Sequence, residues 1–415
     1  MKLLVVGGKL QGTEAVYLAQ KAGWETVLVD RRDAPPASGL ADRHVVADVT
    51  ADETVTRSLV RSCDAVLPAC EDLATLEWLA ARMPGWDVPL LFDIDAYRVS
   101  SSKKASNRLF AGLDVPRPLP WPECGFPVVV KPDVASGSEG VTIVHDGEAL
   151  SAAVERLEAA GHALPVVEEY VAGPSLSIEV LAWNGHAVPL QVTGLEFDDV
   201  YDCRRVVAPV GETHESGLAT VGGGGACDWQ RAVPRGTSSV LRTIGCRIAQ
   251  GLDLHGLMDV EVMVSGSLPK LLEIDARMPS QTPTVVLWSS GLNILELLYR
   301  TVADGAPPEV EVASRRACVY EHVYAHDGRL QIVGEHVMGG AAPLRVVPGF
   351  CGADEALTDY RPGSKAWSAT LIVAADDVAQ ARASAGAVVT ELAQMENLQV
   401  EPEPETYADR ELTGR

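Results

Sequence analysis

The feature that most constrains this chain is a pair of strand-like stretches joined by a short polar turn. Met258–Val264 and Pro269–Asp275 are rich in residues that favour strands, and Ser265–Ser267 between them has the composition of a turn. The pattern predicts an antiparallel hairpin. Such a hairpin brings Glu261 and Glu273 side by side on neighbouring strands.

The acids of this hairpin indicate a cation site. Because the side chains of a strand alternate between its two faces, Glu273, Asp275 and Arg277 share one face. Acids that converge on one face repel one another unless a cation lies between them. Magnesium that bridges nucleotide phosphates relieves this repulsion, since it needs few carboxylates. An exposed hairpin with solvated acids is the alternative that these residues alone leave open.

A second pattern, upstream, has the composition of an anion-binding turn. The apolar strand Phe126–Lys131 ends in a lysine, and the small residues of Ser136–Gly140 follow it. Small residues let backbone N–H groups approach an anion closely, and a lysine supplies a point charge for phosphates. A plain hairpin is the alternative for the turn alone. A helix that opens at Lys103 and a strand over Val166–Val171 lie on either side of this pattern.

The order of these motifs resembles the ATP-grasp ligases over about residues 1–310. The amino-acid sequences of three segments, residues 7–12, 100–110 and 273–284, resemble the pyrrolysine-biosynthesis ligase family in particular. Members of that family join 3-methyl-D-ornithine to the ε-amine of L-lysine. The matching motifs are Lys103, Lys131-Pro, Gly-Ser-x-Gly, Glu168-Glu169-x-Val171, Glu261 and Glu273-x-Asp275-x-Arg277.

The resemblance implies an α/β chain with the ATP-grasp fold and an antiparallel, α+β core. Short apolar strands at Leu3–Val6, Thr26–Asp30, Ala65–Ala69 and Leu90–Asp93 agree with a doubly wound first unit. The expected units are a Rossmann-like pre-ATP-grasp domain at 1–98, a helix and strand-rich lid at 99–180, the catalytic core at 181–310, a C-terminal α+β domain at 311–395 and a flexible tail at 396–415.

The resemblance also implies ATP and Mg²⁺, with two ions, as cofactors. Glu261, Glu273 and Asp275 are then the metal ligands, and Lys131 and Arg277 act in catalysis. The implied ATP-binding residues are Lys103, Lys131, Ser136, Gly137, Ser138, Glu168, Glu169, Tyr170 and Val171.

Amino-acid substrates need partners for their charged groups. Glu179 suits an ammonium group, and an arginine suits a carboxylate. An exposed strand position for Glu179 and a surface pair for Arg204 and Arg205 are the open alternatives. The implied substrate-binding residues are Ser177, Ile178, Glu179, Arg204, Arg205, Arg277, Met278, Pro279, Ser280, Gln281 and Thr282.

The glycines after the first strand form an imperfect dinucleotide fingerprint. Lys9 stands where the middle glycine should allow close approach of a pyrophosphate, and the run is not a P-loop either. The alternative that this N-terminal unit serves only for packing, without binding a nucleotide, stays open. The resemblance implies a lysine-binding site at Leu10, Gln11 and Glu71, and a second nucleotide site at Lys9, Asp30, Asp48 and Val49.

Composition excludes some classes of function. The chain has 415 residues and a formal net charge of −23, which argues against a nucleic-acid surface. No apolar run is long enough to cross a membrane. The apolar run that follows Met1 is too short for a signal peptide. Eight scattered cysteines without metal-like spacing indicate a cytoplasmic protein with reduced thiols. The expected partners are small amino-acid substrates, and a homodimer stays open.

Two other functions remain alternatives at this point. One is an ATP-grasp enzyme for another amino-acid pair, or a carboxylase, although Met278–Thr282 after Arg277 favours the amino-acid ligase. The other is a nicotinamide-dependent oxidoreductase or a non-catalytic nucleotide-binding module built on the first domain. That class would leave the Lys131 turn and the acidic hairpin unexplained.

Overall fold

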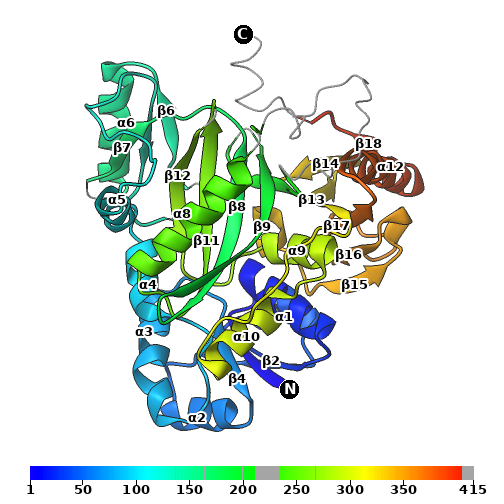
Figure 1. Ribbon diagram of the computed structural model, residues 1–415. Coiled ribbons are helices and arrows are strands. Elements are labelled where there is room, and N and C mark those ends of the chain that lie inside the picture. Colours follow the sequence, from blue (N-terminus) through cyan, green and yellow to red (C-terminus); the bar gives the residue numbers. More distant parts are fainter. Residues whose placement is uncertain are drawn as a thin grey trace.

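The computed structural model describes residues 1–135, 137, 139–162, 164–198, 200–210, 233–234, 236–266 and 268–403 (Figure 1). Ser136 and Ser138 of the predicted phosphate turn lie outside these residues, as do the glycine run at 222–225 and the last segment, 404–415. Three sheets organise the described chain: a four-stranded N-terminal sheet, a three-stranded lid sheet and an eleven-stranded sheet. The predicted α/β class with an antiparallel core is confirmed.

The N-terminal sheet is parallel and buried on both faces, in the strand order β3-β2-β1-β4. Leu3 and Val5 pack with α1, while Leu4 and Val6 pack in a second cluster on the other face. This explains why the first strand is an unbroken apolar run. The elements are β1 (Lys2–Val6), α1 (Leu10–Lys21), β2 (Glu25–Asp30), η1 (Pro36–Gly39), β3 (Arg43–Val46), α2 (Glu53–Arg61), β4 (Ala65–Pro68), α3 (Leu73–Arg82) and η2 (Met83–Gly85).

Two details of this sheet differ from the strands expected from sequence. The edge strand β3 was not anticipated, because Arg43 and His44 interrupt its apolar pattern. The strand expected at Leu90–Asp93 is reduced to a single bridge between Val66 and Leu90. Asp93 instead caps the next helix, accepting hydrogen bonds from two of its N–H groups.

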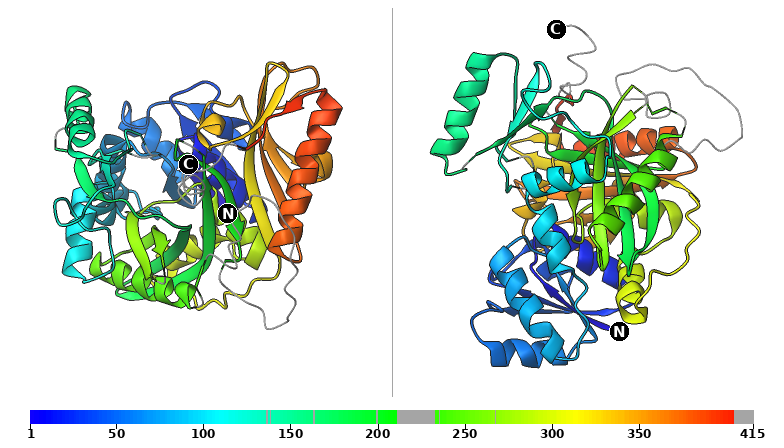
Figure 2. Two further views of the ribbon diagram at one scale, coloured as in Figure 1. Left: turned by 90° about the horizontal axis from the view of Figure 1, so that it is seen from above. Right: turned by 60° about the vertical axis from the view of Figure 1, so that its left-hand side comes forward.

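The lid is a small antiparallel sheet in the order β6-β5-β7. Figure 2 shows that α6 covers the side of this sheet that faces away from the rest of the molecule. Ser102 caps α5 through a hydrogen bond from Ala105 N, so the predicted helix at Lys103 is confirmed. The elements are α4 (Ile94–Ser100), α5 (Lys103–Gly112), β5 (Val128–Lys131), β6 (Thr142–Val144), α6 (Gly147–Ala159) and β7 (Val166–Glu169).

The large sheet begins with the predicted hairpin at its edge, in the order β12-β11-β8-β9-β10. Helix α8 packs against β8 and β9 on one face, and α9 and α10 pack on the other. The elements are β8 (Ser175–Trp183), β9 (His186–Phe197), β10 (Cys203–Ala208), α8 (Thr237–Gly251), β11 (Gly256–Ser265), β12 (Leu268–Asp275), α9 (Thr282–Ser290) and α10 (Ile294–Asp304).

The C-terminal part of the chain continues the same sheet, because β10 pairs directly with β13. Strand β14 pairs with β13 and also with the short β18, and α12 packs on β17 (Figure 1). The elements are β13 (Ala317–His326), β14 (Arg329–Val333), α11 (His336–Gly339), β15 (Arg345–Pro348), η3 (Phe350–Gly352), β16 (Glu355–Thr358), β17 (Trp367–Ala375), α12 (Val378–Glu396) and β18 (Gln399–Val400).

One hydrophobic core, termed the central core, connects the N-terminal sheet with the large sheet. Its side chains come from β1, α1, β9, β10, α9, α10, β13 and β17. They include Leu3, Leu18, Leu195, Val206, Val286, Leu298, Tyr320 and Ile372. Within the described residues, every helix is too short or too polar to cross a bilayer.

Candidate active site

The acids of the predicted hairpin face one another across the strands. Glu261 of β11 lies opposite Glu273 of β12, and its other neighbour is Ser177 of β8. Burial first, and then the charges of Asp259 and Glu273, raise the pKa of Glu261 well above its ordinary value. A carboxyl group in such surroundings is stabilised in its charged form by a nearby cation.

These acids fit a metal ion that is shared with phosphates. Among the described residues, no three His, Cys, Asp or Glu side chains are grouped closely enough to hold a metal by themselves. Magnesium commonly uses only one or two carboxylates and completes its octahedron with waters and phosphate oxygens. Glu261 and Glu273, with Asp275 two residues further along β12, provide that kind of incomplete donor set.

A second acidic row lies beside the first. Asp259 of β11 has Asp275 of β12 on one side and Glu179 of β8 on the other. Burial is the main cause that raises the pKa of Asp259 to about 6 and the pKa of Asp275 to about 7. Ser177 Oγ donates a hydrogen bond to Asp259 Oδ1. Two residues predicted to bind substrate, Ser177 and Glu179, therefore share one face of three adjacent strands with the predicted metal ligands Glu261, Glu273 and Asp275.

Glu179 is the most unusual member of this face. Its side chain is 0% exposed, and in the described part of the chain neither carboxylate oxygen has a hydrogen-bond partner. Burial first, and then the charge of Asp259, raise the pKa of Glu179 to about 8. A buried carboxylate without partners is unfavourable. A ligand that brings an ammonium group to it would supply both the charge and the hydrogen bonds.

Lys103 and Lys131 approach the same region from the lid side. Lys103 Nζ donates to the main-chain oxygen of Ala135 at 2.7 Å and lies 3.0 Å from Glu273 Oε1. Lys131 Nζ lies 2.5 Å from Glu168 Oε1, and both side chains are buried. Two buried lysines next to acids provide positive charge where phosphates would lie.

The two glutamates of β7 have different environments because they point to opposite faces of the lid sheet. Glu168 is buried and also accepts a hydrogen bond from Asn107 Nδ2 at 3.1 Å. Glu169 pairs with Lys270 of β12 at 2.5 Å, which ties the lid to the large sheet. Tyr170 and Val171 follow in the segment that leads into β8, and Val171 is buried.

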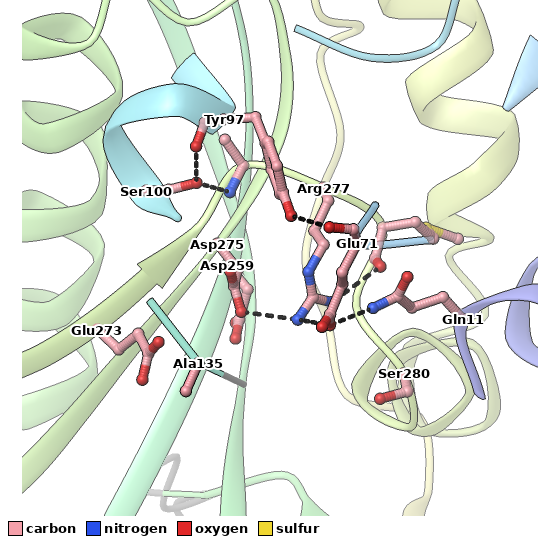
Figure 3. A network of polar contacts seen from close by, with 12 residues as sticks. Gln11, Glu71, Tyr97, Ser100, Ala135, Asp259, Glu273, Asp275, Arg277 and Ser280 are labelled. Atoms are coloured by element: carbon pink, nitrogen blue, oxygen red, sulfur yellow. Dashed lines mark hydrogen bonds and ion pairs between the residues drawn. The ribbon is translucent and has the colours of Figure 1, made fainter. Parts of the chain in front are cut away.

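Arg277 joins residues that were predicted to belong to separate pockets (Figure 3). Its Nη2 lies 2.9 Å from Glu71 Oε1 of the N-terminal domain and 3.0 Å from Asp275 Oδ2. Gln11 Nε2 donates to the same Glu71 oxygen at 2.8 Å. Leu10, the third residue of the predicted lysine site, begins α1 next to Gln11. The predicted lysine site and the acidic hairpin therefore meet at one guanidinium group.

The loop between β12 and α9 is fixed by two acids that sequence reasoning did not single out. Glu335 Oε2 accepts a hydrogen bond from Ser280 Oγ at 2.8 Å. Glu14 of α1, which is almost fully buried, accepts one from Thr284 N at 2.6 Å at the start of α9. Gln281 between them has a positive φ of 72°. The other members of the predicted loop, Met278, Pro279 and Thr282, are buried or nearly so.

The remaining predicted substrate residues differ in their surroundings. Arg205 is held by Glu196 at 2.7 Å and by Glu321 at 2.7 Å, and it also pairs with Glu403. Arg204 Nη2 lies 3.2 Å from the same Glu403. The side chain of Ile178 packs into a hydrophobic cluster with α8, away from the face that carries Glu179. Arg205 and Ile178 are thus part of the framework of the sheet.

The residues predicted for a second nucleotide lie at or after the ends of the first three strands. Asp30 accepts a hydrogen bond from Gly8 N at 2.7 Å and pairs with Arg32 at 2.8 Å. Asp48 accepts from Thr50 N at 2.8 Å. Lys9 directly precedes α1, and Val49, next to Asp48, is buried. In a dinucleotide fold, the acid at the end of the second strand binds the ribose. Here that acid is Asp30, and its carboxylate already contacts Gly8 and Arg32.

The parallel N-terminal sheet, the small lid and the antiparallel core with facing acids define the ATP-grasp class. A sequence model described as an ATP-grasp domain matches residues 101–281. Solved structures agree at the level of the fold. The biotin carboxylase from Campylobacter jejuni has a TM-score of 0.69 at 15% identity, covering 94% of this chain and 91% of its own. The L-amino acid ligase from Bacillus licheniformis has a TM-score of 0.62 at 16% identity, covering 94% and 97%.

Sequence relatives identify the family within this class. The 3-methyl-D-ornithine–L-lysine ligase of Methanosarcina barkeri is 36% identical over 337 residues, which are 81% of this chain and 83% of the relative. The ligase of the same name from Methanosarcina mazei is 34% identical over 338 residues, 81% of each protein. The chain belongs to this family of ATP-grasp carboxylate–amine ligases.

Proposed function

We propose that this protein joins the carboxylate of 3-methyl-D-ornithine, or a similar D-ornithine-like amino acid, to the ε-amine of L-lysine in pyrrolysine biosynthesis. ATP is converted to ADP and phosphate. The identity of the substrates is supported by the family to which the chain belongs. The observation that carries the proposal is the contact of Arg277 with both Glu71 and Asp275, since it brings Glu71, the acid proposed to bind the lysine acceptor, next to the acidic hairpin.

The reaction proceeds through an acyl phosphate. A carboxylate acylates poorly because its leaving group would be oxide, whereas an acyl phosphate loses phosphate. Transfer of the γ-phosphoryl group of ATP activates the first substrate, and the lysine amine then attacks the acyl carbon. Catalysis of both steps consists mainly of positioning and charge neutralisation. Arg277 would stabilise the transferring phosphoryl group or the acyl oxyanion, and its ion pair with Asp275 of the acidic hairpin supports this role.

ATP would lie between the lid and the large sheet. Lys103 and Lys131 would hold its phosphates, and the turn of residues 136–140 would close over them and exclude water. Magnesium, as two ions held by Glu261, Glu273 and Asp275, would offset the negative charge of the phosphate oxygens. Adenine and ribose would be held at Glu168, Glu169, Tyr170 and Val171, partly by the backbone.

The first amino acid would lie between β8 and the loop before α9. Glu179 binds its ammonium group, since the carboxylate is buried without a partner in the described chain. Arg204 is the candidate for the carboxylate of the substrate, assisted by the loop Met278–Thr282. The lysine acceptor would lie at Leu10, Gln11 and Glu71. Binding of a second nucleotide near Asp30 stays a prediction. The formation of a homodimer is a separate prediction.

The products test this proposal. Purified protein with ATP, Mg²⁺, D-ornithine and L-lysine should release ADP and phosphate and form a condensation product whose mass is that of both amino acids less one water. Product mass and nucleotide analysis check this expectation. Release of AMP and pyrophosphate would disprove phosphoryl transfer. Product formation only with a different pair would favour the second candidate, an ATP-grasp ligase for other amino acids. Bicarbonate-dependent ADP release without lysine would indicate a carboxylase.

The variants Glu179→Gln and Glu71→Gln should separate the two amino-acid sites. Each keeps its shape but loses one charge-assisted hydrogen bond, whose loss costs about 1.5–3 kcal/mol, or about 10- to 100-fold in binding. Glu179→Gln should slow ADP release measured without lysine. Glu71→Gln retains an oxygen that can accept from Arg277, so it should mainly raise the KM for lysine. Equal defects in both assays for both variants would contradict separate sites.

Stability provides the control for Glu179. Its pKa is raised from the ordinary value of 4.5 to about 8, so the folded protein binds this proton more tightly than the unfolded chain does. The free energy of unfolding must therefore fall as the pH rises between these two values. Glu179→Gln removes this loss, and the variant should be at least as stable as the parent at pH 8. A catalytic defect in this variant would then not arise from unfolding.

A further inference from the structure

His336 begins the short helix α11 in the C-terminal part of the chain, and it lies against the lid. A β-carbon added to Gly137 would be 2.5 Å from His336 Nε2 and 2.7 Å from its Cε1. The edge of the imidazole ring therefore touches the backbone of the lid turn. Gly137 has a φ of 59°, so both its conformation and its neighbour favour glycine.

Asp202, in the turn between β9 and β10, orients this imidazole. Asp202 Oδ2 lies 2.8 Å from His336 Nδ1 and accepts a hydrogen bond from the His336 main-chain N at 3.1 Å. The carboxylate packs directly against Gly334, where a β-carbon would overlap it. Because Nδ1 is engaged by Asp202, the other ring nitrogen is the one that faces Gly137. The imidazole of His336 is therefore held on both sides, by Asp202 at Nδ1 and by Gly137 at Nε2.

The segment that carries His336 also contacts the substrate loop. The neighbouring Glu335 accepts a hydrogen bond from Ser280 Oγ at 2.8 Å, and its main-chain N donates to Cys203 O at 3.0 Å. His336 is therefore located where the lid, the loop after β12 and the start of β10 meet. These are the parts that must come together when ATP and the first amino acid are bound.

We propose that His336 is a further binding residue of the phosphoryl-transfer site, which holds the lid turn closed and offers its Nε2–H to the phosphates beneath that turn. The inference rests on the proposed function, because it requires that the turn close over ATP. His336 takes no part in bond making or breaking. Its contribution is positive charge and closure, so its loss should admit water that hydrolyses the acyl phosphate.

The charges around the ring agree with this role. Partial burial of the ring lowers the pKa of His336. The hydrogen bond to Asp202, followed by the charges of Asp202, Glu335 and Asp198, outweighs burial and raises this pKa above its ordinary value. Gly137, on the lid side, carries no charge. The ring therefore remains cationic to a higher pH than a free histidine, and closure should weaken only as the pH rises through this raised pKa.

The first test compares His336→Ala with the parent enzyme. We expect the KM for ATP to rise about 10-fold or more, as for loss of one charge-assisted hydrogen bond, with a smaller effect on kcat. The number of ADP molecules released per condensation product should also rise. Asp202→Asn should shift the alkaline fall of kcat/KM for ATP to lower pH. His326→Ala is the matched control, since His326 also lies near an acid, Asp327 at 3.5 Å, but at the turn end of the β13–β14 hairpin.

A double-mutant cycle tests the contact itself. Gly137→Ala should impair ATP use strongly in the parent, where the new methyl group meets the imidazole, and less in the His336→Ala background. Additive effects of the two changes would overturn the contact. An active ligase whose His336→Ala variant keeps the parental KM for ATP and the parental ADP-to-product ratio would overturn only this inference. Absence of ATP turnover by the parent with every amino-acid pair would overturn the proposed function as well.

Discussion

Replacement of Glu273 by alanine should reduce ligation by about 10²- to 10⁴-fold, by analogy with the loss of a key electrostatic contact in a transition state. Glu273 faces Glu261 across the hairpin and lies 3.0 Å from Lys103, so this proposed metal ligand also contacts the lysine proposed to bind phosphate. Glu261→Ala should show a similar loss. The rate should be measured over a range of Mg²⁺ concentrations, together with binding of Mg²⁺–ATP by calorimetry.

The controls for this prediction use another acid and another observable. Glu25 also pairs with a lysine, Lys2 at 2.6 Å, but it lies at the start of β2 in the N-terminal sheet. Glu25→Ala should leave both the rate and the binding of Mg²⁺–ATP unchanged. If Glu273→Ala or Glu261→Ala kept nearly parental turnover at limiting Mg²⁺, the assignment of these acids to the metal would be wrong.

The second large effect is expected for Arg277. Arg277→Ala should lower kcat by about 10³-fold or more, because it removes the charge proposed to stabilise the reacting groups. It also leaves Glu71 and Asp275 without the guanidinium group they share. Arg277→Lys keeps the charge but loses the planar fork, so it should recover only part of the rate. Single-turnover measurements of ADP formation and of condensation would show which step is affected.

Arg98 offers the matched control for Arg277. It also pairs with two acids, Glu77 at 2.9 Å and Asp95 at 2.8 Å, but it is half exposed on α4. Arg98→Ala should not change kcat. An Arg277→Lys variant with full activity would show that a point charge is sufficient at this position. The proposed role of the Arg277 guanidinium in positioning the phosphoryl group or the oxyanion would then have to be abandoned.

The elements with strong local patterns were predictable from sequence. The hairpin at 258–275 has apolar strands around a polar turn, and the structure places Glu261 opposite Glu273 as expected. The helix expected to open at Lys103 is α5, capped by Ser102, which accepts a hydrogen bond from Ala105 N at 3.2 Å. In both cases local chemistry and burial favour the same structure, which is why the pattern is informative.

Residues that act through long-range contacts were not predictable. Glu14 lies within α1 and meets Thr284 at a separation of 270 residues. His336 was not singled out, because its role depends on Asp202 and on the lid turn, which the sequence does not bring together. The contact of Glu71 with Arg277 is of the same kind. A single sequence carries no local signal for such contacts. An acid within a helix that is buried on all sides, as Glu14 is in α1, is the nearest thing to one.

The central core has a consequence for how this enzyme can be divided or recombined. Leu3 and Leu18 of the N-terminal domain pack in the same core as Leu298 of α10 and Ile372 of β17. Excision of residues 1–98 would expose the apolar side of α9 and α10 and would leave the start of α9 without Glu14. A chimaera that takes the proposed acceptor site from a relative therefore has to exchange α9 and α10 along with the N-terminal domain. The unit of exchange is then two segments that are distant in sequence, residues 1–98 and 282–304.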